Sequence, residues 1–108
     1  IVGRNKDMII SGGFNVYARE VEDALAAHAA VAEAAVTGLP DPEWGEVVAA
    51  WVVLRPGAAA DAAELQAHCA ARIAGYKKPR VLRFVDALPR NHAGKVMKQR
   101  LRDDATPG

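Results

Sequence analysis

The feature that most constrains the fold is a pair of Val/Ala-rich runs in the middle of the chain. They occupy Val31–Leu39 and Val47–Leu54, and a loop containing two prolines and a glycine, residues 40–46, separates them. β-branched residues favour strands, whereas Pro and Gly favour the turns between strands. We therefore expect two neighbouring strands whose apolar face must be covered by other elements of the chain.

Shorter segments on either side of this pair complete an alternation of strands and helices. Residues 7–11 and 14–17 are short apolar runs on either side of Gly12-Gly13. This pattern is typical of a β-hairpin, because glycine readily adopts the positive φ of two-residue turns. The remaining expected elements are helices at residues 18–29, 61–75 and 96–103 and a strand at residues 81–85.

Local signals support the first two helices. Val21 and Leu25 are spaced to share one helix face, and Asp61-Ala-Ala-Glu64 has the form of a capping box. Gly75 is a suitable residue for the end of the second helix. We expect inward side chains at Leu65, Cys69, Ile73 and Trp51, and an outward one at Arg83. These elements predict the α+β class: a small two-layer domain with an N-terminal β-hairpin, a three-stranded mostly antiparallel sheet and two to three flanking helices.

Composition excludes several classes of protein. The chain has 108 residues, 51% of them hydrophobic, and a formal net charge of +1, so neither disorder nor a strongly basic nucleic-acid-binding protein is indicated. No apolar run reaches the roughly 20 residues of a membrane span. Cys69 is the only cysteine, and His28, His68 and His92 lack metal-ligand spacing, so we expect no disulfide and no metal site. A single cysteine fits a reducing compartment, and we expect a cytoplasmic protein.

Five segments contain glycines, aromatic residues and charged residues in a specific order. The opening Gly3–Tyr17 is followed by Glu20-Val21-Glu22, and the end of the chain contains Leu88–Val96. Between them lie Trp44-Gly45 and Tyr76-Lys77-Lys78-Pro79-Arg80. From residue 3 to about residue 102, these segments resemble the C-terminal domain of the adenylate-forming superfamily, and specifically of its acyl-CoA synthetases.

The resemblance implies an ATP-dependent, AMP-forming ligase that activates a carboxylic acid as acyl-adenylate and transfers the acyl group to CoA. Residues 1–6 then form a hinge segment, residues 7–104 a mobile C-terminal domain, and residues 105–108 a frayed tail. The chain opens without an initiator methionine, and we expect an N-terminal adenylation domain of the same polypeptide as its partner. That domain should hold the acid, ATP and Mg²⁺, so the isolated C-terminal domain should be inactive.

Lys95 is the candidate catalytic residue. Pro89-Arg90-Asn91-His92-Ala93-Gly94-Lys95 matches the Pro-x-Asn-x-x-Gly-Lys segment of the family, in which the lysine stabilises negative charge during adenylation. A lysine ammonium is a compact charge on a long stem, and Gly94 beside it offers no obstructing side chain. The alternative is an exposed lysine at the start of a basic helix. Acetylation of Lys95, which would remove its charge, is a regulatory alternative compatible with this role.

The resemblance assigns further residues to the nucleotide, the hinge and CoA. Lys6 occupies the hinge position, and Arg4 matches an arginine near the nucleotide ribose. Gly12 and Gly13 match a loop that lines the pantetheine tunnel. Trp44, Lys78 and Arg80 are candidates for contacts with the adenine and phosphates of CoA. Each of these residues could instead be an ordinary exposed charge, turn or loop aromatic.

Two positions depart from the family pattern, and two other functions compete with the main interpretation. Ala18 stands where relatives usually have proline. Phe14 stands where relatives that act on aromatic acids often have glutamate, whereas Phe is frequent in relatives that act on fatty acids, which favours a fatty-acid substrate. Within the superfamily, a carrier-protein-loading adenylation domain or a luciferase-like enzyme would share Lys95. From another class, a small basic module could bind nucleic acid, although the near-neutral charge argues against it.

Overall fold

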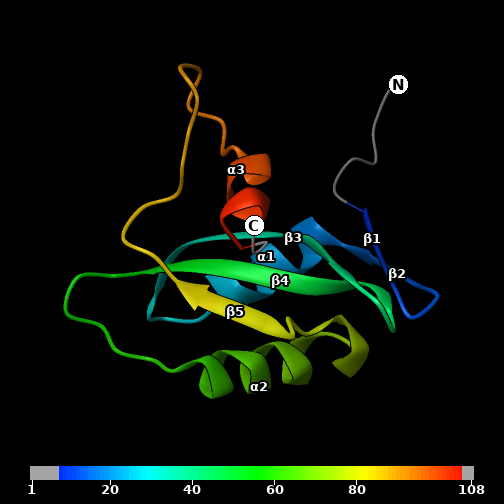
Figure 1. Cartoon of the computed structure of the whole chain (residues 1–108). Coiled ribbons are helices and arrows are strands. Elements are labelled where there is room, and N and C mark those ends of the chain that lie inside the picture. The colour runs from blue at the N-terminus through cyan, green and yellow to red at the C-terminus, as the bar shows by residue number, and fades with distance from the viewer. Residues whose placement is uncertain (1–7, 106–108) are drawn as a thin grey trace.

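The chain folds into a five-stranded sheet with helices on both of its faces (Figure 1). The computed structural model describes residues 8–105. In chain order its elements are β1 (Met8–Ser11), β2 (Phe14–Tyr17), α1 (Ala18–Ala26), β3 (Val31–Asp41), β4 (Gly45–Leu54), α2 (Ala62–Arg72), the 3₁₀ turn η1 (Gly75–Lys77), β5 (Val81–Phe84) and α3 (Lys98–Ala105).

Strand β4 is the centre of the sheet. Along one edge it pairs antiparallel with β3, and along the other it pairs in parallel with β5. The start of that second edge also meets the hairpin β1–β2 through the Ser11–Gly45 pair and a hydrogen bond from Gly12 N–H to the Trp44 carbonyl. The hairpin therefore belongs to the main sheet, which has five strands instead of the expected three.

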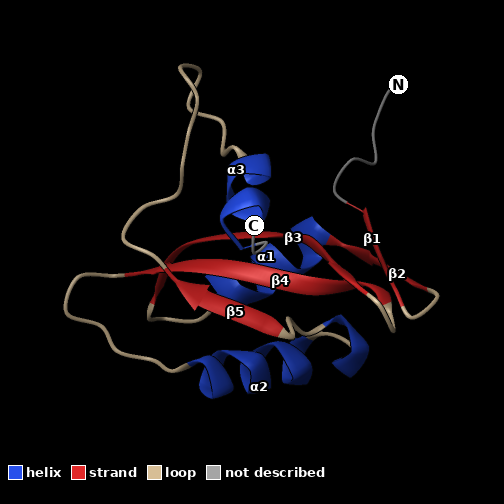
Figure 2. Cartoon of the chain, viewed as in Figure 1, coloured by secondary structure: helices blue, strands red, loops and turns tan. Residues whose placement is uncertain are grey.

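Both faces of β4 are buried, which corrects the expected two-layer arrangement. Val48, Ala50 and Val52 face a core that α1 and α2 cover, whereas Ala49 and Trp51 face a second core. This second core is completed by side chains from the C-terminal part of the chain: Val81, Val85, Leu88, Val96 and Leu101. Figure 2 shows α2 and α3 on opposite sides of the strands. Burial on both faces explains why residues 47–54 are all apolar, because both faces of this strand are covered by other parts of the chain.

Each predicted helix ends or begins a few residues from its expected boundary. Helix α1 ends at Ala26, because His28 Nδ1 accepts a hydrogen bond from Ala30 N–H and turns the chain into β3. Helix α2 ends at Arg72, before the expected Gly75, because Ile73 is extended and packs against the first core. Helix α3 begins at Lys98 instead of residue 96, since Val96 is used to close the preceding loop.

The other local predictions are confirmed. Asp61 caps α2, its Oδ1 accepting from Glu64 N–H at 2.7 Å. Trp51 is 2% exposed, Leu65 and Cys69 are fully buried, and Arg83 is exposed.

Within residues 8–105, no helix is both long and apolar enough to cross a membrane.

The buried thiol of Cys69 gives a prediction for the pH dependence of stability. Burial raises the pKa of Cys69 from 9.0 to about 11, because the thiolate would lose its hydration inside the core. The folded state therefore holds this proton more tightly than the unfolded state. This contribution to the free energy of unfolding is fully present below about pH 9 and is lost as the pH rises through about 11.

Denaturant unfolding measured across the alkaline range checks this prediction, and thiol labelling checks the burial that causes it. We expect Cys69 to stay unlabelled in the folded protein near neutral pH and to react fully once denaturant unfolds it. The Cys69→Ala variant is the control, since its stability should lack the alkaline component that titration of the thiol adds. Rapid labelling of the folded protein at neutral pH would contradict the burial of this side chain.

Candidate functional site

Lys95 lies at the end of a closed loop between β5 and α3. The two limbs of the loop meet at an isolated bridge between Arg90 and Val96, and Met97 N–H donates to the Pro89 carbonyl at 2.8 Å. Asn91 N–H donates to the Lys95 carbonyl at 3.0 Å. In Figure 1 this loop rises above the sheet and turns back into α3. The backbone of Lys95 is therefore fixed on both sides, and its exposed side chain extends from a defined turn.

The spacing of the motif follows from the geometry of this turn. The Asn91 side chain uses Oδ1 to accept hydrogen bonds from Ala93 N–H at 2.9 Å and Lys95 N–H at 3.0 Å. Gly94 has a φ of +85°, a conformation that costs other residues energy. Asparagine and glycine at these two positions thus fold the loop back on itself, so that Lys95 follows the turn directly.

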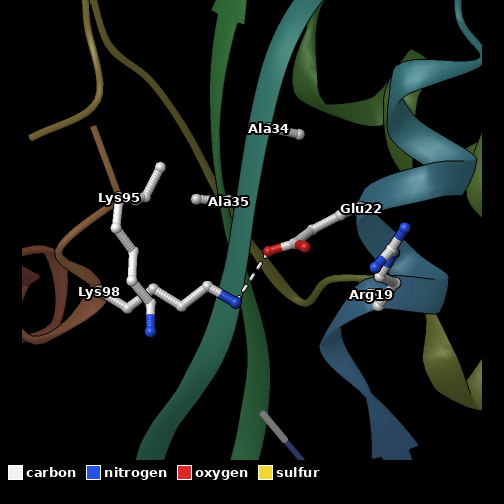
Figure 3. Close-up of a pocket in the computed structure, with 7 residues that line it drawn as sticks. Arg19, Glu22, Ala34, Ala35, Lys95 and Lys98 are labelled. Carbon is white, nitrogen blue, oxygen red and sulfur yellow. Dashed lines mark ion pairs between the residues drawn. The ribbon is translucent and has the colours of Figure 1, made fainter. Parts of the chain in front are cut away.

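Lys95 borders a surface hollow of about 510 Å³ that spans the outer edge of β3. Figure 3 shows Lys95 and Lys98 on one side of the strand and Arg19 and Glu22, from α1, on the other. Among the described residues of the lining, Glu22 is the only acidic one, and its carboxylate forms an ion pair with Lys98 at 2.9 Å. With Lys98 paired to Glu22, Arg19 and Lys95 supply the remaining positive charge of this lining, which suits the approach of an anionic substrate.

The structure brings together three of the residues predicted to bind CoA. Trp44 packs over Gly12, where an added Cβ would lie 2.5 Å from Trp44 Cε3. The guanidinium of Arg80 stacks on the same indole, 4.4 Å from the ring centroid. Trp44 remains 37% exposed. A flat aromatic surface beside a cation and bare glycine backbone is chemically suited to a ligand that combines a ring with phosphates.

Local hydrogen bonds hold Trp44 in this place. Asp41 Oδ2 accepts from the N–H groups of Glu43 and Trp44 at 3.0 and 2.9 Å, which closes the turn between β3 and β4. Gly13, next to Gly12, is exposed with no atom within 4 Å of an added Cβ, and Lys78 is exposed near Arg80 in the chain. In Figure 1, the β1–β2 and β3–β4 turns lie at the end of the sheet away from the Lys95 loop, so the two groups of predicted residues form separate sites.

The predicted hinge and nucleotide-binding residues cannot be placed relative to these two groups. Arg4 and Lys6 lie outside the described residues. In the part of the chain that the structure describes, no group of three His, Cys, Asp or Glu side chains could hold a metal ion.

Sequence reasoning missed the side chains that tie the Lys95 loop to the sheet. Arg90 forms an ion pair with Glu33 of β3, and Lys98 pairs with Glu22 of α1. The partners are separated by more than fifty residues in each case, so no local pattern connects them. The only signal was at Glu33, which interrupts a mostly apolar run, whereas Glu22 stands in a charged stretch beside Asp23.

Comparison with known proteins matches this chain to a described family. The AMP-binding enzyme C-terminal domain matches residues 20–95. Among curated proteins, the chain is 55% identical to the 7a-methyl-1,5-dioxo-octahydro-1H-inden-4-yl propanoyl:CoA ligase of Rhodococcus jostii (strain RHA1), with 96% of this chain and 20% of that protein covered.

Solved structures with this fold include other synthetases. A Mycobacterium tuberculosis fatty acyl CoA synthetase is 44% identical with a TM-score of 0.88, over 95% of this chain and 20% of the other. The amide bond synthetase McbA from Marinactinospora thermotolerans is 40% identical with a TM-score of 0.92, over 98% of this chain and 22% of the other. The chain thus spans about a fifth of the length of these relatives.

The contact between Gly12 and Trp44 predicts different effects for two adjacent glycine substitutions. Both Gly12→Ala and Gly13→Ala place a side chain at positive φ, so each should lower the free energy of unfolding by about 1–2 kcal/mol. Only Gly12→Ala also forces Trp44 to move, because the new Cβ overlaps the indole.

Tryptophan fluorescence and its quenching by a soluble quencher distinguish the two variants. We expect a shifted emission and greater quenching for Gly12→Ala and an unchanged signal for Gly13→Ala, with buried Trp51 as a constant background. Identical spectra for both variants would mean that Trp44 does not rest on Gly12.

Proposed function

The chain belongs to the AMP-binding enzyme C-terminal domain family, and on this basis we propose that it is the mobile C-terminal domain of an AMP-forming acyl-CoA ligase. The observation that carries the proposal is the closed loop that presents Lys95. Asn91 and Gly94 fold this loop, and they are the two residues whose spacing to the lysine defines the motif. The names of the relatives, a CoA ligase for a propanoyl group that bears a two-ring substituent and a fatty acyl CoA synthetase, support the same activity.

Lys95 supplies positive charge during the first half-reaction. There, a carboxylate oxygen of the acid attacks the α-phosphorus of ATP, the bond to the pyrophosphate oxygen breaks, and pyrophosphate leaves with the electron pair. Negative charge gathers on the oxygens around phosphorus, and an ammonium positioned for that moment lowers the barrier. An exposed lysine on a rigid turn can enter the active site of another domain without a change in its own backbone.

The surface formed by Gly12, Trp44 and Arg80 serves the second half-reaction. The CoA sulfur attacks the acyl carbon of the adenylate, and AMP leaves. Bare backbone at Gly12 and Gly13 lets the pantetheine approach closely, while Trp44 packs against the adenine and the cations of Lys78 and Arg80 contact phosphates. The separation of this surface from the Lys95 loop supports a rotation of the domain between the two half-reactions (Figure 1).

The rest of the active site belongs to the N-terminal domain of the same polypeptide. The chain spans a fifth of the length of its relatives, which supports a larger partner domain, and the family resemblance assigns the acid and most contacts to ATP and Mg²⁺ to that domain. Arg4 contacts the nucleotide and Lys6 is the hinge. A fatty acid is the favoured substrate because of Phe14, and the ring-bearing propanoate in the name of the Rhodococcus relative is the second candidate to assay.

A different acyl acceptor is the main competing function. The likeness to an amide bond synthetase indicates that this fold also serves enzymes with other second half-reactions, and a carrier-protein-loading adenylation domain would keep Lys95 as well. Binding to nucleic acid has weaker support. Lys77 is engaged with Glu20, Lys98 with Glu22 and Arg90 with Glu33, so these cations are already partly neutralised.

Replacing the lysine in the full-length enzyme tests the proposed activity. We expect Lys95→Ala to slow pyrophosphate release from ATP and a panel of fatty and ring-bearing acids by about 10²–10³-fold, because a single group that stabilises transition-state charge has this effect. Thioester formation from presynthesised acyl-adenylate should survive. Arg100→Ala, which removes an exposed neighbouring charge, is the control; equal rates for both variants would reject Lys95 as the adenylation cation.

The CoA surface gives a complementary prediction. Trp44→Ala and Arg80→Ala should each raise KM for CoA about tenfold, as expected for losing one stacking or charged contact, and leave adenylation unchanged. Steady-state thioester assays at varied CoA concentration measure this. If these variants leave KM for CoA unchanged while a carrier protein is acylated efficiently, the carrier-loading alternative is favoured.

A further inference from the structure

One limb of the Lys95 loop is tied to the sheet by Arg90. Its guanidinium donates from Nη1 to the Gly94 carbonyl at 2.8 Å, and from Nη2 to Glu33 Oε1 on β3. The Gly94 carbonyl belongs to the peptide that joins Gly94 to Lys95. The planar guanidinium of one side chain therefore connects strand β3 to the backbone that carries the lysine, in a pair whose side chains are 44% and 41% exposed.

The other limb is tied by Lys98, the first residue of α3. Its ammonium lies 2.9 Å from Glu22 Oε2, and the same oxygen accepts Val36 N–H at 2.9 Å. Figure 3 shows Lys98 reaching across β3 to Glu22, which extends from α1. The two side chains are only 21% and 23% exposed, so solvent screens this pair less than a fully exposed one.

Both ties end at the outer edge of the same strand. Val36 N–H faces away from β4 and would be unpaired at a free edge without Glu22. Glu22 is thus fixed by the sheet, and Glu33 is part of β3 itself. The loop is fastened to a rigid element on each side of Lys95, five residues before it and three residues after it.

We propose that Arg90 and Lys98 are positioning residues, which act through Lys95 by holding its loop at the edge of β3. This inference rests on the proposed function. The contact of Lys95 with the reacting groups lasts only while the domain occupies the adenylation pose, so the loop must already have its productive shape when it arrives. Displacement of a catalytic group by about 1 Å can cost about a hundredfold in rate.

The test uses the full-length enzyme with Arg90→Gln, Lys98→Met and the conservative Lys98→Arg. We expect Arg90→Gln and Lys98→Met to lower kcat for adenylation about tenfold to a hundredfold with KM for ATP and acid unchanged. The thioester half-reaction should be unaffected, and Lys98→Arg should recover most of the lost rate. Glu20→Gln is the matched control, since Glu20 forms a similar ion pair from the same helix, with Lys77, away from the loop.

Combination with Lys95→Ala separates positioning from general destabilisation. If Arg90 and Lys98 act through Lys95, their substitution in the Lys95→Ala enzyme should cause no further loss of adenylation. Additive losses, equal loss in both half-reactions, or a loss matched by Glu20→Gln would overturn the inference. Should Lys98→Met fail to fold, Glu33→Gln tests the other tie by the same assays. Full adenylation by Lys95→Ala alone would reject the proposed function instead.

Discussion

Burial of β4 on both faces is the constraint on which the rest of the structure depends. Its side chains alternate between two cores, so helices α1 and α2 must cover one face and α3 with the preceding segment must cover the other. A strand with neighbours on both edges and apolar cover on both faces is a rigid platform. The two groups of functional residues are attached to this platform through loops, and each takes its position from it.

The same platform explains how a small domain can carry both the surface around Trp44 and the loop that presents Lys95. The turn that leads into β4 places Trp44 against Gly12 and Arg80, while the segment after β5 crosses to the second face and forms the Lys95 loop. Loops fastened to a rigid sheet can be presented in turn to one partner domain by rotation of the whole body. The proposed alternation between two poses would therefore need no rearrangement within the described part of the domain.

Sequence patterns predicted the helices, strands and motifs, but they did not predict that other parts of the chain cover both faces of the sheet. The apolar run Val47–Leu54 predicts a strand, yet its lack of any polar residue also indicated burial on two faces, which the two-layer expectation overlooked. Helix ends were misplaced where tertiary contacts decided them, as when Ile73 leaves the helix to pack on the core. The hairpin was predicted correctly, but its pairing with β4 depends on residues more than thirty positions away.

The sequence by itself determined the local chemistry: the glycines that turn at positive φ, the aspartate cap of α2, and the Asn-x-x-Gly-Lys spacing that shapes the lysine loop. These features involve neighbours within a few residues, so their physics is contained in short segments. Only the tertiary structure decided that Trp44, Gly12 and Arg80 share one surface and that Glu33 and Glu22 fasten the Lys95 loop. Such contacts arise when packing of the sheet brings distant segments together, and no local pattern records them.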